Sequence, residues 1–116
     1  MELNHVSDIS RTVELQLRVG SALRPEQTRK LHRAMTALAE DCLEIGQTQT
    51  AADILAYVLC QIDADSVTLE RANELFTELE SRVCPRLILD AREFAAGMDL
   101  RTMLEYLLDV VPRERN

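Results

Sequence analysis

Apolar residues recur at steps of three and four along most of the chain, which is the spacing that places side chains on one side of an α-helix. The clearest stretch crosses a turn formed by Gly46, Gln47 and Thr48. The apolar positions are Leu31, Met35, Leu38, Cys42 and Ile45 before this turn and Ala51, Ile54, Leu55, Val58, Leu59 and Ile62 after it. Two amphipathic helices joined by three polar residues predict a helical hairpin over residues 25–62.

Proline, glycine and capping residues predict where these two helices begin and end. Pro25 suits the first position of a helix, where a backbone N–H has no partner within the helix in any case. Gly46 suits the left-handed conformation that ends many helices. Thr48 suits the N-cap of the second helix, which we expect to continue to about residue 61.

Three further helices are predicted over residues 65–111. The first has the most regular amphipathic pattern of the chain and continues to Val83. The start and stop signals of the three helices, in chain order, are Asp65 or Ser66, Pro85, Gly97, Asp99 and Pro112. The sequence therefore predicts an all-α fold with five helices.

The N-terminal region fits two patterns, and a sixth helix depends on which one holds. The apolar residues of 12–19 alternate with polar ones, as in a strand, whereas Ile9, Val13 and Leu17 fall four apart, as on a helix. Both interpretations stay open. A short strand would have to pair between two chains, because a lone strand leaves its backbone groups unsatisfied. Residues 1–10 have no pattern and are expected to be frayed.

Composition favours packed helices in a single domain. The chain has 116 residues, and 47% of them are hydrophobic, so it can bury a core without disulfides or metal. Aromatic residues make up 3%, with no Trp, so the core must consist of aliphatic side chains and Met. The low aromatic content also disfavours the stacking platforms that bind single-stranded nucleic acid.

The charge of −7 is spread unevenly along the chain. Residues 11–33 carry six basic and two acidic side chains, whereas residues 34–116 carry seven basic and sixteen acidic ones. A nucleic-acid partner is therefore unfavourable for the domain as a whole.

Targeting signals and cysteine spacing indicate the compartment. No apolar run approaches the roughly 18 residues that a membrane helix needs, and residues 1–20 lack a secretory signal. The three cysteines have no C-x-x-C spacing, so neither a disulfide framework nor a zinc site is predicted. We expect a cytoplasmic protein with no cofactor and no membrane partner.

The residues around the first hairpin turn match a known repeat. Leu38 and Ala39 supply the large and then small residues of a first helix, and Ala51 and Leu55 supply the small and then bulky residues of a second. With Gly46 at the turn, this stretch resembles a tetratricopeptide-type helix–turn–helix repeat. Cys42, Thr48 and Asp63 depart from the pattern of that family.

A second resemblance covers residues 55–110. Arg71-Ala72-x-x-Leu75-Phe76-x-x-Leu79-Glu80, followed by a helix that contains Ala91-Arg92, resembles the terminal helices of tetratricopeptide-like arrays in large bacterial signalling regulators. Both resemblances imply stacked antiparallel helical hairpins that present a groove to a partner protein.

No catalytic, cofactor-binding or metal-ligating residue is predicted. His32 is expected to be a solvated surface side chain. The carboxylate pairs Asp41 with Glu44 and Asp90 with Glu93 have no histidine at ligand spacing, and no nucleophile or phosphate-binding motif occurs. We therefore expect that the chain is not an enzyme.

Candidate partner-binding residues come from three features. Glu70, Glu74 and Glu78 form an acidic stripe at steps of four, Arg29, Lys30 and Arg33 form a basic cluster, and Tyr57 is a candidate groove anchor. The last helix has more apolar side chains than one packing face requires. Its predicted oligomer face consists of Met103, Leu104, Leu107, Leu108 and Val111.

Three functional hypotheses follow. The first is a protein–protein interaction module or adaptor in bacterial regulation, which binds another protein or peptide and also self-associates. The second is a DNA-binding regulator of the ribbon-helix-helix type, with residues 12–19 as the paired strand and Thr48 opening a phosphate-binding helix. The third is a small helical chaperone or oligomerisation subunit that uses residues 99–116 as a dimer face.

Overall fold

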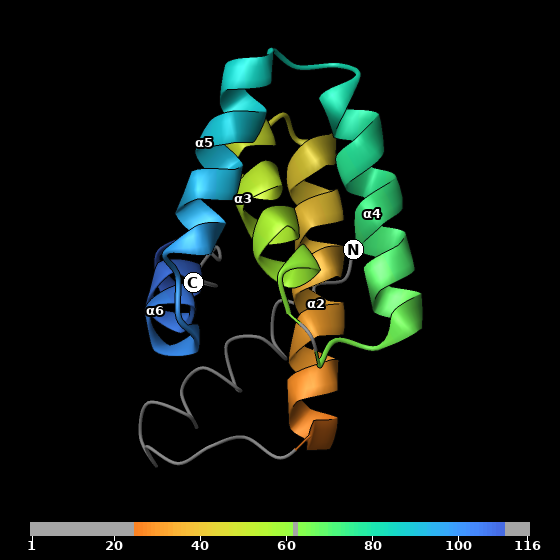
Figure 1. The fold of residues 1–116 in the computed structure, drawn as a ribbon, viewed down its shortest axis with the longest axis vertical. Coiled ribbons are helices and arrows are strands. Elements are labelled where there is room, and N and C mark those ends of the chain that lie inside the picture. Colours follow the sequence, from red (N-terminus) through yellow and green to blue (C-terminus); the bar gives the residue numbers. More distant parts are fainter. Residues whose placement is uncertain (1–24, 62, 111–116) are drawn as a thin grey trace, which may run out of the picture.

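The computed structural model describes residues 25–61 and 63–110, and within them every regular element is a helix (Figure 1). The helices are α2 (Pro25–Glu44), α3 (Thr48–Leu59), α4 (Ser66–Glu80), α5 (Pro85–Ala96) and α6 (Leu100–Val110). The predicted all-α class is confirmed. The two interpretations of residues 12–19 and the prediction for residues 1–10 lie outside the described residues.

The hairpin turn between α2 and α3 has the predicted glycine at its centre. Gly46 has a φ of +86°, and its N–H donates to the carbonyl of Leu43. The N–H of Gln47 donates to the carbonyl of Cys42 over 2.8 Å. These two bonds form the Schellman motif, which satisfies carbonyls that the end of a helix leaves without partners.

Four of the five helix starts agree with their sequence signals, and one does not. The first is Pro25, where α2 begins as predicted. Asp65 accepts a hydrogen bond from the backbone N–H of Thr68 over 2.7 Å, and Asp99 accepts one from Thr102 over 2.8 Å. Pro85 is the first residue of α5. The predicted cap at Thr48 is wrong, because Gln47 holds the N-cap position and makes no side-chain capping bond.

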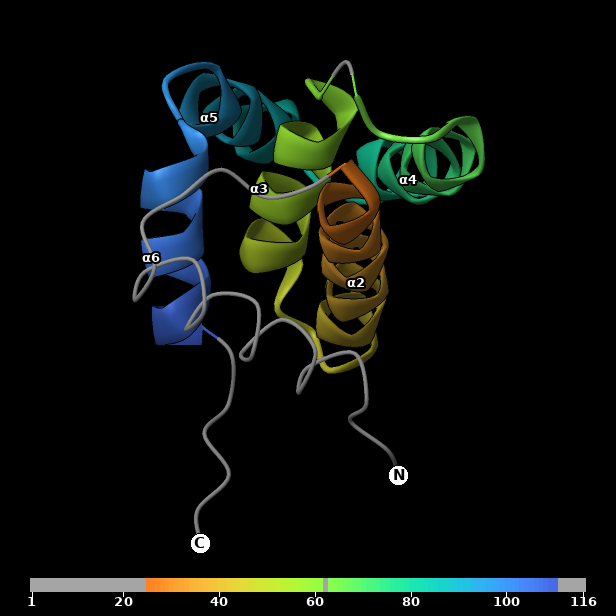
Figure 2. The ribbon, with the colours of Figure 1, turned by 90° about the horizontal axis from the view of Figure 1, so that it is seen from below.

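Helix α3 lies at the centre of the described helices. It packs against α2, α4 and α5, and α4 also contacts α2. Figures 1 and 2 both show α4 and α5 on opposite sides of α3. The turn between α4 and α5 is short, yet the two helices diverge from it instead of packing along their length (Figure 1). The antiparallel α2–α3 pair is thus present, and regular stacking of further hairpins stays a prediction.

The core is aliphatic, and α3 supplies its middle. Every side chain from Ala51 to Val58 is buried. The largest fully buried side chains elsewhere include Leu31, Met35, Leu79, Met103, Leu104 and Leu107. Burying this aliphatic surface is the main favourable contribution to folding in a chain that has few aromatic residues.

His32 belongs to this interior, so the prediction of a solvated histidine is wrong. Its side chain is 1% exposed. It lies three residues before Met35 and seven before Ala39, which places all three on the inner side of α2. Among the described residues its Nδ1 has no hydrogen-bond partner, and burial lowers the pKa of the imidazole below its usual 6.5.

Candidate functional site

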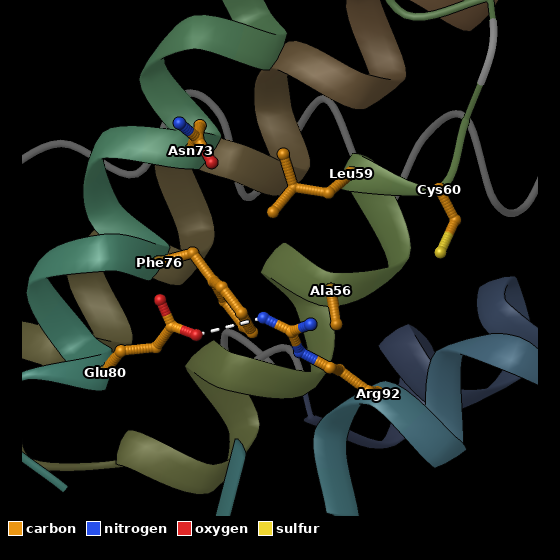
Figure 3. Close-up of a pocket in the computed structure, with 7 residues that line it drawn as sticks. All are labelled: Ala56, Leu59, Cys60, Asn73, Phe76, Glu80 and Arg92. Carbon is orange, nitrogen blue, oxygen red and sulfur yellow. Dashed lines mark hydrogen bonds and ion pairs between the residues drawn. The ribbon is translucent and has the colours of Figure 1, made fainter. Parts of the chain in front are cut away.

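A groove opens to solvent between α4 and α5, over the C-terminal part of α3 (Figure 3). We call it the α4–α5 groove. Its volume is about 340 Å³. The residues that line it are Ala56, Leu59 and Cys60 of the α3 end, Asn73, Phe76 and Glu80 of α4, and Arg92 of α5.

The helical period explains why α4 presents these side chains together. Asn73, Phe76 and Glu80 are separated by three and then four residues, so they lie on one side of the helix. Because α5 diverges from α4 (Figure 1), this side of α4 lines the groove (Figure 3). The groove thus follows from the angle between two helices joined by a short turn.

The floor of the groove is apolar. Ala56 and Phe76 are each 4% exposed and belong to the core, and Leu59 is half-buried. Cys60 is an exposed free thiol at the end of α3. Leu59 is the apolar side chain of this floor that stays partly open to solvent, and a partner that covers it gains free energy.

Arg92 crosses the groove and connects its two walls. Its guanidinium carbon lies 5.3 Å from the centre of the Phe76 ring, which is a cation–π contact. Its Nη2 donates to Oε2 of Glu80 over 2.9 Å (Figure 3). The side chains of Arg92 and Glu80 are 60% and 40% exposed. An ion pair as exposed as this one contributes little to stability and is easily exchanged for another partner.

The predicted acidic stripe lies on exposed positions of α4 outside this groove. Glu74 pairs with Arg71 over 3.2 Å, and Arg71 also pairs with Glu40 of α2. Glu78 pairs with Arg82 over 2.9 Å, and Glu70 is exposed. Glu78 also borders a shallow pocket of about 240 Å³ between α2 and α4. The stripe is therefore partly neutralised by arginines.

The predicted basic cluster lies on α2 and does not reach the groove. Arg29, Lys30 and Arg33 are exposed, and Nη2 of Arg33 lies 3.4 Å from the carboxylate of Asp65. This pair connects α2 to the start of α4. The structure thus places the acidic and basic candidates on different surfaces of the described chain from the α4–α5 groove.

Tyr57 is not a groove anchor in this structure. It is 2% exposed, and burial raises the pKa of its hydroxyl to about 12. A tyrosine this buried, near the C-terminal end of α3, leaves no exposed surface for a partner to contact. An aromatic residue of the groove is Phe76 instead.

The predicted oligomer face is also largely inside the chain. Met103, Leu104 and Leu107 are fully buried, so a contact between copies through them would require these side chains to leave the interior. Leu108 is part of α6, and Val111 lies outside the described residues. Self-association through this face stays a prediction.

A second polar cluster connects α3, α5 and α6. Asp53, which is 9% exposed, accepts a hydrogen bond from Gln49 over 3.0 Å and one from the Tyr106 hydroxyl over 3.3 Å. The Tyr106 ring packs on Phe94 with centroids 4.8 Å apart. Burial raises the pKa of Asp53, while the two hydrogen bonds lower it. These two bonds and the ring contact join three helices to one another.

Sequence reasoning did not identify Phe76, Glu80 or Arg92 as site residues. Phe76 has the spacing of a core residue, and the two charged residues have the spacing of solvated positions. The available signal was the face shared by Asn73, Phe76 and Glu80, which places one large apolar side chain between two polar ones. That signal identifies a site only when the direction of α5 is known.

The described residues contain no group of three or more His, Cys, Asp or Glu side chains that are placed to hold a metal ion. None of the helices in this part of the chain has the length and apolar content needed to cross a bilayer. Comparisons with protein-family models, with curated proteins and with solved structures gave no significant match to the chain.

Proposed function

We propose that this chain is a non-enzymatic protein–protein interaction module whose α4–α5 groove receives a segment of a partner protein. The observation that supports this proposal is a groove between two diverging helices, in which Leu59 is a partly exposed apolar side chain. Its volume of about 340 Å³ is at the lower end of the range for ligand pockets and suits a few side chains of a peptide or helix.

The distribution of residues in the groove resembles that of small protein interfaces. Phe76 and Leu59 provide the apolar centre, and Asn73, Glu80 and Arg92 provide a polar rim. In such interfaces a few central side chains contribute most of the binding free energy, while rim charges set orientation and association rate. An adaptor in the bacterial cytoplasm that also self-associates is the form of this function that we propose.

The DNA-binding alternative gains no support from the described residues. Its paired strand would be residues 12–19, which lie outside them. Its first helix would be α2, which has 20 residues and exceeds what that family uses. The chaperone alternative depends on the apolar side chains of α6, of which Met103, Leu104 and Leu107 are buried.

Site-specific photo-crosslinking in the source cells tests the proposal. A photoreactive residue replaces Asn73, which is exposed and lines the groove. The matched control carries the same residue at Glu70, which is exposed on α4 but does not line the groove. We expect a discrete crosslinked protein from position 73 and none from position 70. No crosslink at 73, or the same product from both positions, would count against the groove as the binding site.

A further inference from the structure

The α4–α5 groove already contains a planar cation that belongs to the chain itself. The guanidinium of Arg92 lies over the ring of Phe76, 5.3 Å from its centre, and donates to the Glu80 carboxylate over 2.9 Å. An aromatic face beside a carboxylate is an arrangement that binds guanidinium groups, because the ring attracts the cation and the carboxylate accepts its N–H groups. The chemistry of the groove therefore suits an arginine side chain.

Arg92 is held in this position by exposed contacts only. Its side chain is 60% exposed, and that of Glu80 is 40% exposed. Ion pairs and cation–π contacts that are open to water are each weak. An arginine of a partner protein can therefore replace Arg92 with a small loss of free energy, if the partner also supplies apolar side chains that cover the floor of the groove.

The electrostatic surroundings favour a basic partner over an acidic one. The chain has a net charge of −7, and Glu80 lines the groove. Helix α3 ends at Cys60 beside the groove, so the partial negative charge of its C-terminus points there. Arg92 is the one cation among the residues that line the groove. Once it moves aside, the carboxylate, the ring face and the helix end all favour a positive group.

We infer that the α4–α5 groove, in the interaction role proposed above, receives an arginine of a basic amphipathic segment of another protein. Arg92 occupies the arginine position until this segment binds. The inference rests on the proposed function and specifies its partner. Arg92 then competes with the partner's arginine for the Phe76 ring and the Glu80 carboxylate. Removal of the Arg92 side chain is therefore expected to strengthen binding.

The basic cluster of α2 in a second copy does not fit this partner chemistry. In this cluster, Arg33 is already paired with Asp65. We place the segment that fills the apolar floor and provides a guanidinium in another protein, because a basic segment complements the net charge of −7, and the sedimentation experiment below judges a second copy as the occupant.

The test measures fluorescence anisotropy of labelled probe peptides with the full 116-residue chain. The first probe is a helical 14-residue peptide with leucines on one face and two flanking arginines. A second probe carries citrulline in place of arginine, which keeps the shape and removes the charge. A third carries glutamate. We expect the wild-type chain to bind the arginine probe about tenfold more tightly than the citrulline probe, and to bind the glutamate probe least.

Two groove variants and two matched controls separate the local effect from bulk charge. Arg92→Ala is expected to raise the affinity for the arginine probe about fivefold to tenfold, and Glu80→Gln to lower it by a similar factor. The control for Arg92→Ala is Arg86→Ala, which removes an exposed arginine of α5. The control for Glu80→Gln is Glu105→Gln, which changes an exposed glutamate of α6. Each control changes the net charge by the same amount as its matched groove variant. Both controls are expected to leave the affinity within twofold of wild type. Circular dichroism verifies that all four variants are folded.

Several outcomes would overturn the inference. Preferential binding of the glutamate probe, abolished by Arg92→Ala, would show an acidic partner and would leave the proposed function intact. An equal gain for Arg86→Ala and Arg92→Ala would show bulk electrostatics in place of competition. Self-association that changes with Arg92→Ala in sedimentation would make a second copy the occupant. No probe binding by wild type or by Arg92→Ala would remove the arginine site, and the crosslinking at position 73 would still judge the proposed function separately.

Discussion

Tyr106 of α6 donates a hydrogen bond from its hydroxyl to the carboxylate of Asp53 in α3, over 3.3 Å. The two residues are 53 positions apart in the sequence. The other carboxylate oxygen accepts from Gln49, and the Tyr106 ring packs on Phe94 of α5. One side chain of the last described helix thus contacts the central helix with its hydroxyl and the neighbouring α5 with its ring, at the partly buried edge of the aliphatic core.

Tyr106→Phe is expected to lower the free energy of unfolding by about 1 kcal/mol, because the hydroxyl bond to Asp53 is lost while the ring contact with Phe94 remains. Tyr106→Ala removes both and is expected to cost about 3–5 kcal/mol. Urea unfolding followed by circular dichroism measures both values. If Tyr106→Phe were as stable as the wild type, the hydrogen bond would contribute nothing to the attachment of α6.

Asp53→Asn is expected to change how stability depends on pH. Burial raises the pKa of Asp53 above its usual 3.8, so the native state holds this proton more tightly than the unfolded state does. Stability from this group is therefore fully present below pH 3.8 and is lost as the pH rises through the raised native value. The free energy of unfolding of wild type relative to Asp53→Asn should decrease over that window. Unfolding titrations at a series of acidic pH values measure it, and an increase with pH would contradict the assignment.

The wild-type chain is expected to lose stability at mildly acidic pH because of His32, and the His32→Leu variant is expected not to show this loss. Burial lowers the pKa of His32 below 6.5, although the charges of Asp63 and Asp65 oppose this. The unfolded state therefore takes up the proton first, and the wild-type chain loses stability as the pH falls through 6.5 towards the lowered native pKa. Unfolding at pH about 7.5 and about 5.5 compares the two proteins. The chain has one other histidine, His5, which both proteins share, so their difference reports His32 alone.

Gly46→Ala is expected to cost about 1 kcal/mol, since the φ of +86° at this position places an alanine in the left-handed region. Gly97→Ala is the matched control. Gly97 follows α5 with a φ of −100°, and a Cβ added at either glycine meets no atom within 4 Å. The control is therefore expected to be neutral or to stabilise by about 0.5 kcal/mol through the unfolded chain. Equal thermal unfolding of the two variants would mean that backbone strain at Gly46 is unimportant.

The start and stop signals of the helices were predictable because they act within a few residues. Gly46, Asp65, Pro85 and Asp99 each occupy the expected place, and each acts through its own backbone or a bond to a residue three positions away. The end of α4 was predicted less well. It lies at Glu80 and not at Val83, although the apolar spacing continues to that residue.

Burial and the site were less predictable because they depend on how the helices cross. Nothing local distinguishes His32 from a surface histidine until α3 and α4 are packed beside α2. Tyr57 has the spacing of a rim residue, but α3 has neighbours on three sides, and this side chain near its C-terminal end is buried. The α4–α5 groove depends on the divergence of two helices, and that angle has no counterpart in the apolar spacing of either one.

The enclosure of α3 also has a consequence for the history of the chain. Eight successive side chains, from Ala51 to Val58, are buried, and one of them is the carboxylate of Asp53. Mutations at these positions disturb several contacts at once, so selection should remove them more often than changes on the outer helices. In a distant relative, a short run of small and aliphatic residues that also holds one acid and one tyrosine, with another tyrosine about fifty residues later, should be the last recognisable trace of common descent.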